Sequence, residues 1–267
     1  MRIPFTKAHG ALNDFLLTWA HGAAPSGYTE IARAICDRHA GIGADGWMLV
    51  GPPSADRRIH GATRLFNSDG SEAEISGNGT RCAAAFLVDA GLAHDSVSIR
   101  TGAGVKELRL IERSGDRYLF EMNMGRPSFP EPAPVTLDVI GLQLTATIVD
   151  VGNPQCAVHV DAFDFDWRGA GAAVAHHARF PNRTNVSFVR RADGNTIDVR
   201  FWERGAGETM SSGTGSTGAA AVAMRLGWVT GPVTVRTPAG SLNLRIENDE
   251  IFLTGPAQIV GVGEFYL

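Results

Sequence analysis

The strongest constraint on the fold of this chain is an internal duplication. Ser76 corresponds to Ser212 at an offset of 136 residues (212 − 76), and the same offset continues without a gap into 97–104 and 233–240. A constant offset over about 40 residues is hard to explain by chance, and it predicts two copies of one structural unit. The copies are too long and too few for a solenoid, so each is expected to be a substantial fold unit.

Each copy combines one helix with several strands. An alanine-rich helix is expected at 80–90 and again at 216–226, ended by Gly91 and Gly227. Short β-type runs predict strands at 63–66, 97–100, 105–111, 117–123, 197–202, 233–236, 242–246 and 250–254. The prediction is an α+β fold of two pseudo-symmetric, strand-rich halves, each wrapped around a central helix.

The boundary between the halves is expected at Arg113–Asp116, where a Ser-Gly-Asp turn interrupts two strand patterns. The first half is predicted as 1–114 together with 256–267, because the C-terminal strand is expected to return to it. The second half is then 115–255, and the active site is expected in the cleft between the halves.

Composition excludes several classes of protein. The chain has 267 residues, is 44% hydrophobic and 19% charged, and carries a formal net charge of −4. This balance gives no reason to expect nucleic acid or an anionic membrane as a partner. The N-terminal segment 1–7 lacks the pattern of a secretory signal, and no apolar run is long enough for a membrane helix. The expected location is the cytoplasm.

The residues Ser-Gly-X-Gly precede the expected helix in both copies, at Ser76 and Ser212. Helix amino ends offer free N–H groups and partial positive charge, so each can hold an anion such as a carboxylate. Two such ends could present one serine to each face of a ligand, so that one removes a proton and the other returns one. That is the logic of a cofactor-free racemase or epimerase. The alternative interpretation is that both serines are simple helix caps.

A series of ordered motifs resembles the diaminopimelate epimerase family along nearly the whole chain. They are KAHGALNDF at 7–15, GIGADG at 41–46, FNSDGSEAE at 66–74, SGNGTRC at 76–82, VGNP at 151–154, TNV at 184–186 and ERGAGET at 203–209. The resemblance implies an isomerase that needs no cofactor or metal and converts LL-diaminopimelate to the meso form in the lysine and cell-wall pathway. It also implies a small-molecule amino acid substrate and a homodimer.

The resemblance also implies roles for individual residues. Asn13 and Asn153 would hold the reacting end of the amino acid. Its α-carboxylate would be bound by backbone N–H groups of Gly77, Asn78, Gly213 and Thr214. The distal end would be recognised by Asn67, Asn185, Glu203 and Arg204, with Arg204 gripping a carboxylate. Taken one at a time, such asparagines are more often turn residues.

The chain departs from the family pattern at the acid/base pair. The family uses two cysteines where this chain has Ser76 and Ser212, and Gln155 stands where the family usually has a histidine. Leu12 also replaces a common glycine. A thiol has a pKa near 8.5, whereas a hydroxyl is a far weaker acid that needs an adjacent base. Glu203 is the candidate partner of Ser212, so the predicted catalytic set is Ser76, Ser212 and Glu203.

Three hypotheses about function therefore stay open. The chain is an epimerase working with hydroxyls and carboxylates, a related isomerase acting on another amino acid, or a protein that binds an amino acid with little or no turnover. Two G-x-G-x-x-G matches, at 41–46 and 213–218, lack the other parts of a dinucleotide site. No zinc-binding, P-loop or G-x-S-x-G motif is present in the sequence.

Overall fold

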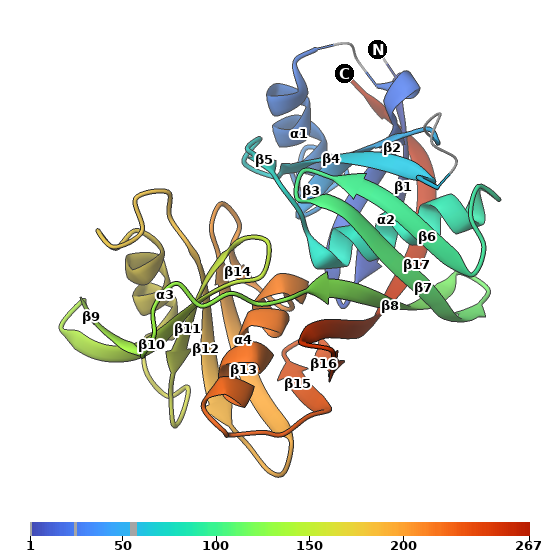
Figure 1. Ribbon diagram of the computed structural model, residues 1–267. Helices are drawn as coiled ribbons and strands as arrows, with labels where there is room; N and C mark the ends of the chain where they lie inside the picture. The colour runs from blue at the N-terminus through green and yellow to red at the C-terminus, as the bar shows by residue number, and fades with distance from the viewer. Residues whose placement is uncertain (1, 24–25, 54–57) are drawn as a thin grey trace. The chain divides into compact units, whose positions relative to one another are not determined.

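The computed structural model describes residues 2–23, 26–53 and 58–267 (Figure 1). Its internal contacts divide the chain into two compact units. Unit 1 is Met1–Met122 with Thr254–Leu267, and unit 2 is Asn123–Leu253. The chain therefore passes from unit 1 to unit 2 at Met122–Asn123, later than the expected boundary at Arg113–Asp116. That segment is instead the tight turn of a hairpin inside unit 1, where Ser114 pairs with Arg117.

Unit 1 begins with the β1–β2 hairpin, and its first segment ends in the long β7–β8 hairpin. Its elements are β1 (Arg2–Gly10), β2 (Asn13–Trp19), η1 (Ala20–Gly22), α1 (Tyr28–Cys36), β3 (Gly46–Gly51), β4 (Gly61–Asn67), β5 (Glu72–Ala73), α2 (Gly77–Asp89), β6 (Ser96–Thr101), β7 (Gly104–Ser114) and β8 (Arg117–Gly125). The C-terminal strand β17 (Glu250–Tyr266) returns to this unit, where Arg2 pairs with Tyr266.

The strands of unit 1 form a closed ring. β1 pairs with β2, and β2 lies parallel to β3. The order continues through β4, β6, β7 and β8, and β8 pairs with β17, which pairs back to β1. Closure leaves no free sheet edge in this ring.

Unit 2 repeats this arrangement. Its elements are β9 (Val135–Val139), β10 (Leu142–Asp150), β11 (Pro154–His159), α3 (Trp167–Ala175), β12 (Asn185–Arg191), β13 (Thr196–Glu203), β14 (Gly207–Thr209), α4 (Gly213–Arg225), β15 (Val233–Thr237) and β16 (Gly240–Glu247). From β10 to β16 the pairings alternate between antiparallel and parallel as they do from β1 to β7. The duplication therefore covers whole units, beyond the segment with the constant sequence offset.

A small-residue helix is buried in each unit. Every residue of α2 from Gly77 to Val88 is buried, as is every residue of α4 from Gly213 to Ala223. Figure 1 shows α2 among the strands of unit 1. The amino ends approach the strands closely: a Cβ at Gly79 would lie 2.8 Å from Met48 Cε, and one at Gly215 would lie 2.8 Å from Phe201 Cδ1. Glycine at these two matching positions lets each helix reach its sheet.

Both buried helices end as the sequence predicts but begin earlier. The N–H groups of Gly91 and Leu92 bond to carbonyls of the last turn of α2, and Gly91 has a left-handed φ of 71°. The N–H groups of Gly227 and Trp228 likewise bond to carbonyls of the last turn of α4, and Gly227 has a left-handed φ of 69°. Both ends are Schellman motifs, which explains the two glycines. The helices start at 77 and 213 because the preceding serines cap them.

Two shorter helices, α1 and α3, were not predicted from the sequence. Each packs on a surface of its unit: α1 against β3 and β4, and α3 against β9, β12 and β13. Within the described ranges, no helix is long and apolar enough to cross a membrane.

The cysteines are free and buried in the two units. Burial raises the pKa of Cys36, Cys82 and Cys156 to about 12 in each case. A thiol with such a pKa is almost entirely protonated near neutral pH and is a poor nucleophile or base. The cysteines present therefore do not replace the cysteine pair of the family.

We expect the native protein to be inert to thiol reagents. Dithionitrobenzoate at pH 8 should release almost no thionitrobenzoate from the folded chain and three equivalents after denaturation in guanidinium, because only unfolding exposes the three thiols. The variant Ser114→Cys, with a thiol in the exposed β7–β8 turn, is the positive control. Rapid labelling of the folded wild type would contradict the burial.

Candidate active site

The amino end of α2 is a serine cap. Ser76 is extended, with φ −127° and ψ 124°, and its Oγ accepts a hydrogen bond of 3.1 Å from the N–H of Gly79. The hydroxyl of Thr80 donates to the Ser76 carbonyl at 2.7 Å. Ser76 is thus a helix cap whose oxygen accepts the N–H of Gly79, and an acid/base role of its hydroxyl stays a prediction. The hydroxyl stands at the positive end of the helix dipole, beside the backbone of Gly77 and Asn78.

The amino end of α4 has the same geometry. Ser212 has φ −136° and ψ 124°, and its Oγ accepts a hydrogen bond of 3.1 Å from the N–H of Gly215. Thr217 Oγ1 donates to the Gly213 carbonyl at 2.8 Å. Ser212 is 4% exposed and Thr214 is also 4% exposed. The two serines expected from the repeat are therefore equivalent in structure as well as in sequence.

One asparagine contacts each helix end. Asn13, which begins β2, accepts a hydrogen bond from Asn78 Nδ2 at 3.1 Å. Asn153, next to β11, donates to Thr214 Oγ1 at 3.4 Å. Asn13 and Asn153 hold matching places, at the end of the β1–β2 turn in unit 1 and of the β10–β11 turn in unit 2. The structure thus brings the two residues expected at the reacting end to the serine-capped helix ends.

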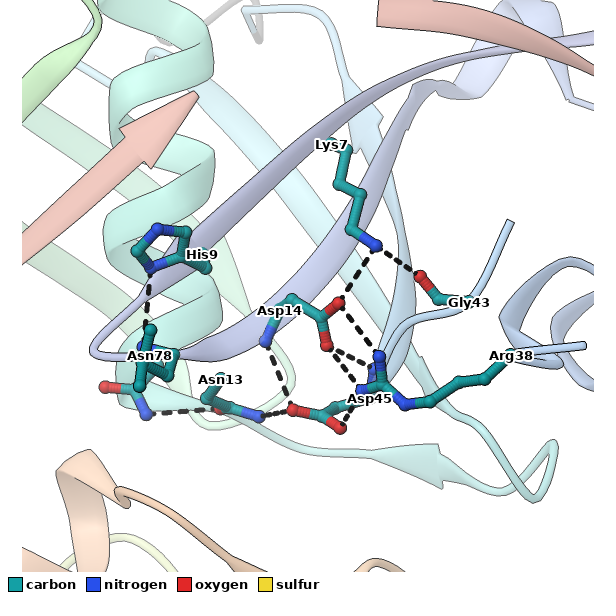
Figure 2. A network of polar contacts seen from close by, with 9 residues as sticks. Lys7, His9, Asn13, Asp14, Arg38, Gly43, Asp45 and Asn78 are labelled. Atoms are coloured by element: carbon teal, nitrogen blue, oxygen red, sulfur yellow. Dashed lines mark hydrogen bonds and ion pairs between the residues drawn. The ribbon is translucent and has the colours of Figure 1, made fainter. Parts of the chain in front are cut away.

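A network of charged groups holds Asn13 in place (Figure 2). Asn13 Nδ2 donates to Asp45 Oδ2 at 2.6 Å, and Arg38 bonds to both Asp45 and Asp14. Lys7 lies 3.1 Å from Asp14. Burial by itself would raise the pKa of Asp14, but hydrogen bonds from Arg38 and Lys7 outweigh it, so the pKa lies below its ordinary value. The Asp14 carboxylate is therefore charged at neutral pH.

Gln155 occupies the corresponding region of unit 2. It is 1% exposed, and its Nε2 donates to Asn153 Oδ1 at 2.7 Å. Its Oε1 has no hydrogen-bond partner among the described residues. The side chain packs against the first turns of α4, where a Cβ at Gly218 would lie 3.3 Å from Gln155 Cγ. An amide here can orient Asn153, but it cannot serve as a general base.

Three residues expected at the distal end of the ligand lie where β12 begins and the antiparallel strand β13 ends. Asn185 Oδ1 accepts a hydrogen bond of 3.0 Å from the N–H of Arg204. Glu203 Oε1 accepts one of 2.8 Å from Thr209 Oγ1. The guanidinium of Arg204 reaches the Asn182 carbonyl at 3.4 Å. Unit 2 therefore gathers Asn185, Glu203 and Arg204 into one polar group.

Asn67 lies in unit 1, at the end of β4. Its N–H bonds to the Ser71 carbonyl at 2.8 Å, and its Nδ2 donates to Ser71 Oγ at 3.0 Å. These contacts show that Asn67 forms a turn, as isolated asparagines often do.

Sequence reasoning assigned no role to Asp45 or Arg81, although both lie inside quoted motifs. Asp45 holds Asn13, and the fully buried Arg81 donates to Asn78 Oδ1. A charged residue in a stretch that must be buried was the available signal for Arg81, because charged side chains are rarely buried without a specific partner.

Comparison with known proteins identifies the family. Residues 5–130 and 147–260 match the family model described as diaminopimelate epimerase. The diaminopimelate epimerase of Halothermothrix orenii is 35% identical over 285 residues, covering 100% of this chain and 99% of the relative. That of Archaeoglobus fulgidus is 40% identical over 273 residues, covering 97% and 95%.

Solved structures with the same fold are more distant in sequence. A probable proline racemase from Agrobacterium radiobacter has a TM-score of 0.77 at 15% identity, over 98% of this chain and 92% of that one. A hydroxyproline epimerase from Agrobacterium vitis has a TM-score of 0.76 at 15% identity, over 98% and 90%. At this identity the likeness supports the fold alone. The full-length match to the family model and to curated relatives shows that this chain belongs to the diaminopimelate epimerase family.

Proposed function

We propose that the chain is a cofactor-independent amino acid epimerase that converts LL-diaminopimelate to the meso form. The observation that carries the proposal is the matched pair of serine-capped helix ends, each contacted by an asparagine, in a member of this family. A carboxylate bound by the N–H groups of Gly77, Asn78, Gly213 and Thr214 would be stabilised by helix dipoles. The same groups would stabilise the enolate-like charge that develops when the α-proton leaves.

Ser76 and Ser212 act in this proposal as the acid/base pair. Each hydroxyl oxygen already accepts a helix N–H, which favours a more negative oxygen and leaves its proton free to be donated. Glu203 is the proposed base behind Ser212. Asn67, Asn185, Glu203 and Arg204 are proposed to recognise the distal amino acid end, with the guanidinium on its carboxylate.

One structural observation supports a second candidate function, which is binding without turnover. Both hydroxyls are held as helix caps, and Gln155 cannot act as a base where the family usually has a histidine. Such a site would still bind an amino acid carboxylate at its helix ends. Solvent exchange of the α-proton separates the two functions.

The first test is proton NMR of LL- and meso-diaminopimelate with the purified chain in D2O. We expect loss of the α-proton signal together with interconversion of the isomers, because proton removal and return use different groups. Ser76→Ala with Ser212→Ala should slow the exchange by about a hundredfold or more. Binding by calorimetry without exchange would establish the second candidate, and the absence of both would exclude this substrate.

The second test restores the thiols of the family. Ser76→Cys with Ser212→Cys should raise the epimerisation rate by about tenfold or more, because a thiol near a helix amino end ionises far more readily than a hydroxyl. Ser114→Cys, far in sequence from both helix ends, is the matched control and should leave the rate unchanged. A folded but inactive double variant would mean that the site has been rebuilt around hydroxyls.

The proposal includes a cytoplasmic homodimer, as the family resemblance implies. Three buried, unpaired cysteines are in keeping with a reducing compartment. Analytical ultracentrifugation at micromolar concentration should give a species of twice the chain mass of 28.4 kDa. A species at the chain mass itself would remove the dimer from the proposal and leave the epimerase proposal unchanged.

A further inference from the structure

Arg81 is a fully buried cation in the second turn of α2. It is 0% exposed, and its three acceptors among the described residues are neutral: the carbonyls of Pro256 and Gly77, at 3.1 and 3.3 Å, and the side-chain oxygen of Asn78. Burial lowers its pKa to about 10, so it remains charged at neutral pH. Among the described residues, no carboxylate forms an ion pair with it. Buried charges are normally paired, so a charge compensated only by neutral dipoles calls for a reason.

The guanidinium acts on the peptide group proposed to bind the ligand carboxylate. Nη1 of Arg81 donates to the carbonyl oxygen of Gly77, and that carbonyl shares its peptide group with the N–H of Asn78. A hydrogen bond from a charged donor polarises the whole peptide group. The N–H on its other side becomes a stronger donor as a result.

Arg81 also begins a directed chain of side-chain hydrogen bonds. Arg81 donates to Asn78 Oδ1, Asn78 Nδ2 donates to Asn13 Oδ1, and Asn13 Nδ2 donates to Asp45 Oδ2. An arginine can only donate, and the Asp45 carboxyl accepts at both oxygens, from Arg38 and from the N–H of Asp14 as well as from Asn13. The two ends therefore fix the orientation of both amides, and Figure 2 shows the part of the chain from Asn78 to Asp45.

Unit 2 has a neutral group at the matching position. Thr217 corresponds to Arg81 by the 136-residue offset, and its hydroxyl donates to the Gly213 carbonyl as Arg81 donates to that of Gly77. The contact is thus kept in both units, but only unit 1 supplies a positive charge. The two helix ends are alike in geometry and unlike in electrostatics.

We propose that Arg81 is a positioning residue that makes the amino end of α2 the stronger of the two carboxylate-binding ends, by polarising the Gly77–Asn78 peptide and fixing the amides of Asn78 and Asn13. The proposal rests on the proposed function in taking the ligand to be an amino acid carboxylate. Whichever substrate the protein acts on, the group bound at the amino end of α2 is an anion in this proposal. Acetate can therefore probe that helix end without the substrate.

The test is an acetate titration of the ¹⁵N-labelled full chain, followed through backbone amide resonances. On acetate binding, the amide proton of Asn78 should shift further downfield than that of Thr214, because charge-assisted hydrogen bonds are the stronger ones. Arg81→Met should abolish this difference, and Arg81→Lys should keep most of it. Equal acetate-induced shifts of the Asn78 and Thr214 amide protons in the wild type would overturn the proposal, even if no variant folds.

Steady-state kinetics with diaminopimelate provide a second test of the role of Arg81. Arg81→Met should raise KM by about tenfold and lower kcat as well, since the carboxylate gains charge in the transition state. The rate should recover substantially in Arg81→Lys. Arg109→Met, which removes an exposed guanidinium on β7, is the matched control.

Equal losses in the Met and Lys variants, in parallel with a lower melting temperature, would show a merely structural role and overturn the proposal. A wild type without turnover would refute the proposed function, while the acetate titration would still decide the role of Arg81.

Discussion

The fold depends on burying one helix inside the strands of each unit. A buried helix cannot leave its first N–H groups to water, so they need acceptors supplied by the chain or by a ligand. Ser76 and Ser212 satisfy one such group each, that of Gly79 and that of Gly215. The duplication thus produces two polar helix ends inside otherwise apolar units, and these ends are the places where an anion can be held.

Ser76 and Ser212 cap their helices, and the proposed function gives each of them a second role as a proton donor or acceptor. A hydroxyl is a good helix cap and a weak acid, whereas a thiol is a poorer cap and a stronger acid. An asparagine contacts each helix end, Asn13 in unit 1 and Asn153 in unit 2. The family resemblance implies cysteines at the two capping positions, so the proposed difference from the family lies in proton chemistry.

Much of the architecture could be predicted from the sequence. The constant offset from Ser76 to Ser212 revealed the duplication, and Gly91 and Gly227 marked the helix ends correctly because only a left-handed residue forms these turns easily. The match between the β1–β2 and β10–β11 hairpins could not be predicted from the 136-residue offset. Asn13 and Asn153 are separated by 140 residues (153 − 13), so the offset is not constant there. The short helices α1 and α3 were also missed, because their periodic pattern is too brief to distinguish from loops.

The sequence by itself determined the repeat, the strand-rich class and the identity of the residues at the helix ends, because these follow from local patterns and from motifs that stand in a fixed order. Only the tertiary structure decided which partner each polar side chain has. It showed Asn67 in a turn, Gln155 on Asn153, and Arg81 buried beneath the Gly77–Asn78 peptide, with neutral acceptors among the described residues. These three pairings span only two to four residues, but Arg81 also donates to the carbonyl of Pro256, 175 residues away, and Asn78 donates to Asn13, 65 residues away. All of these contacts depend on how helix and strands pack, which spacing along one sequence does not specify.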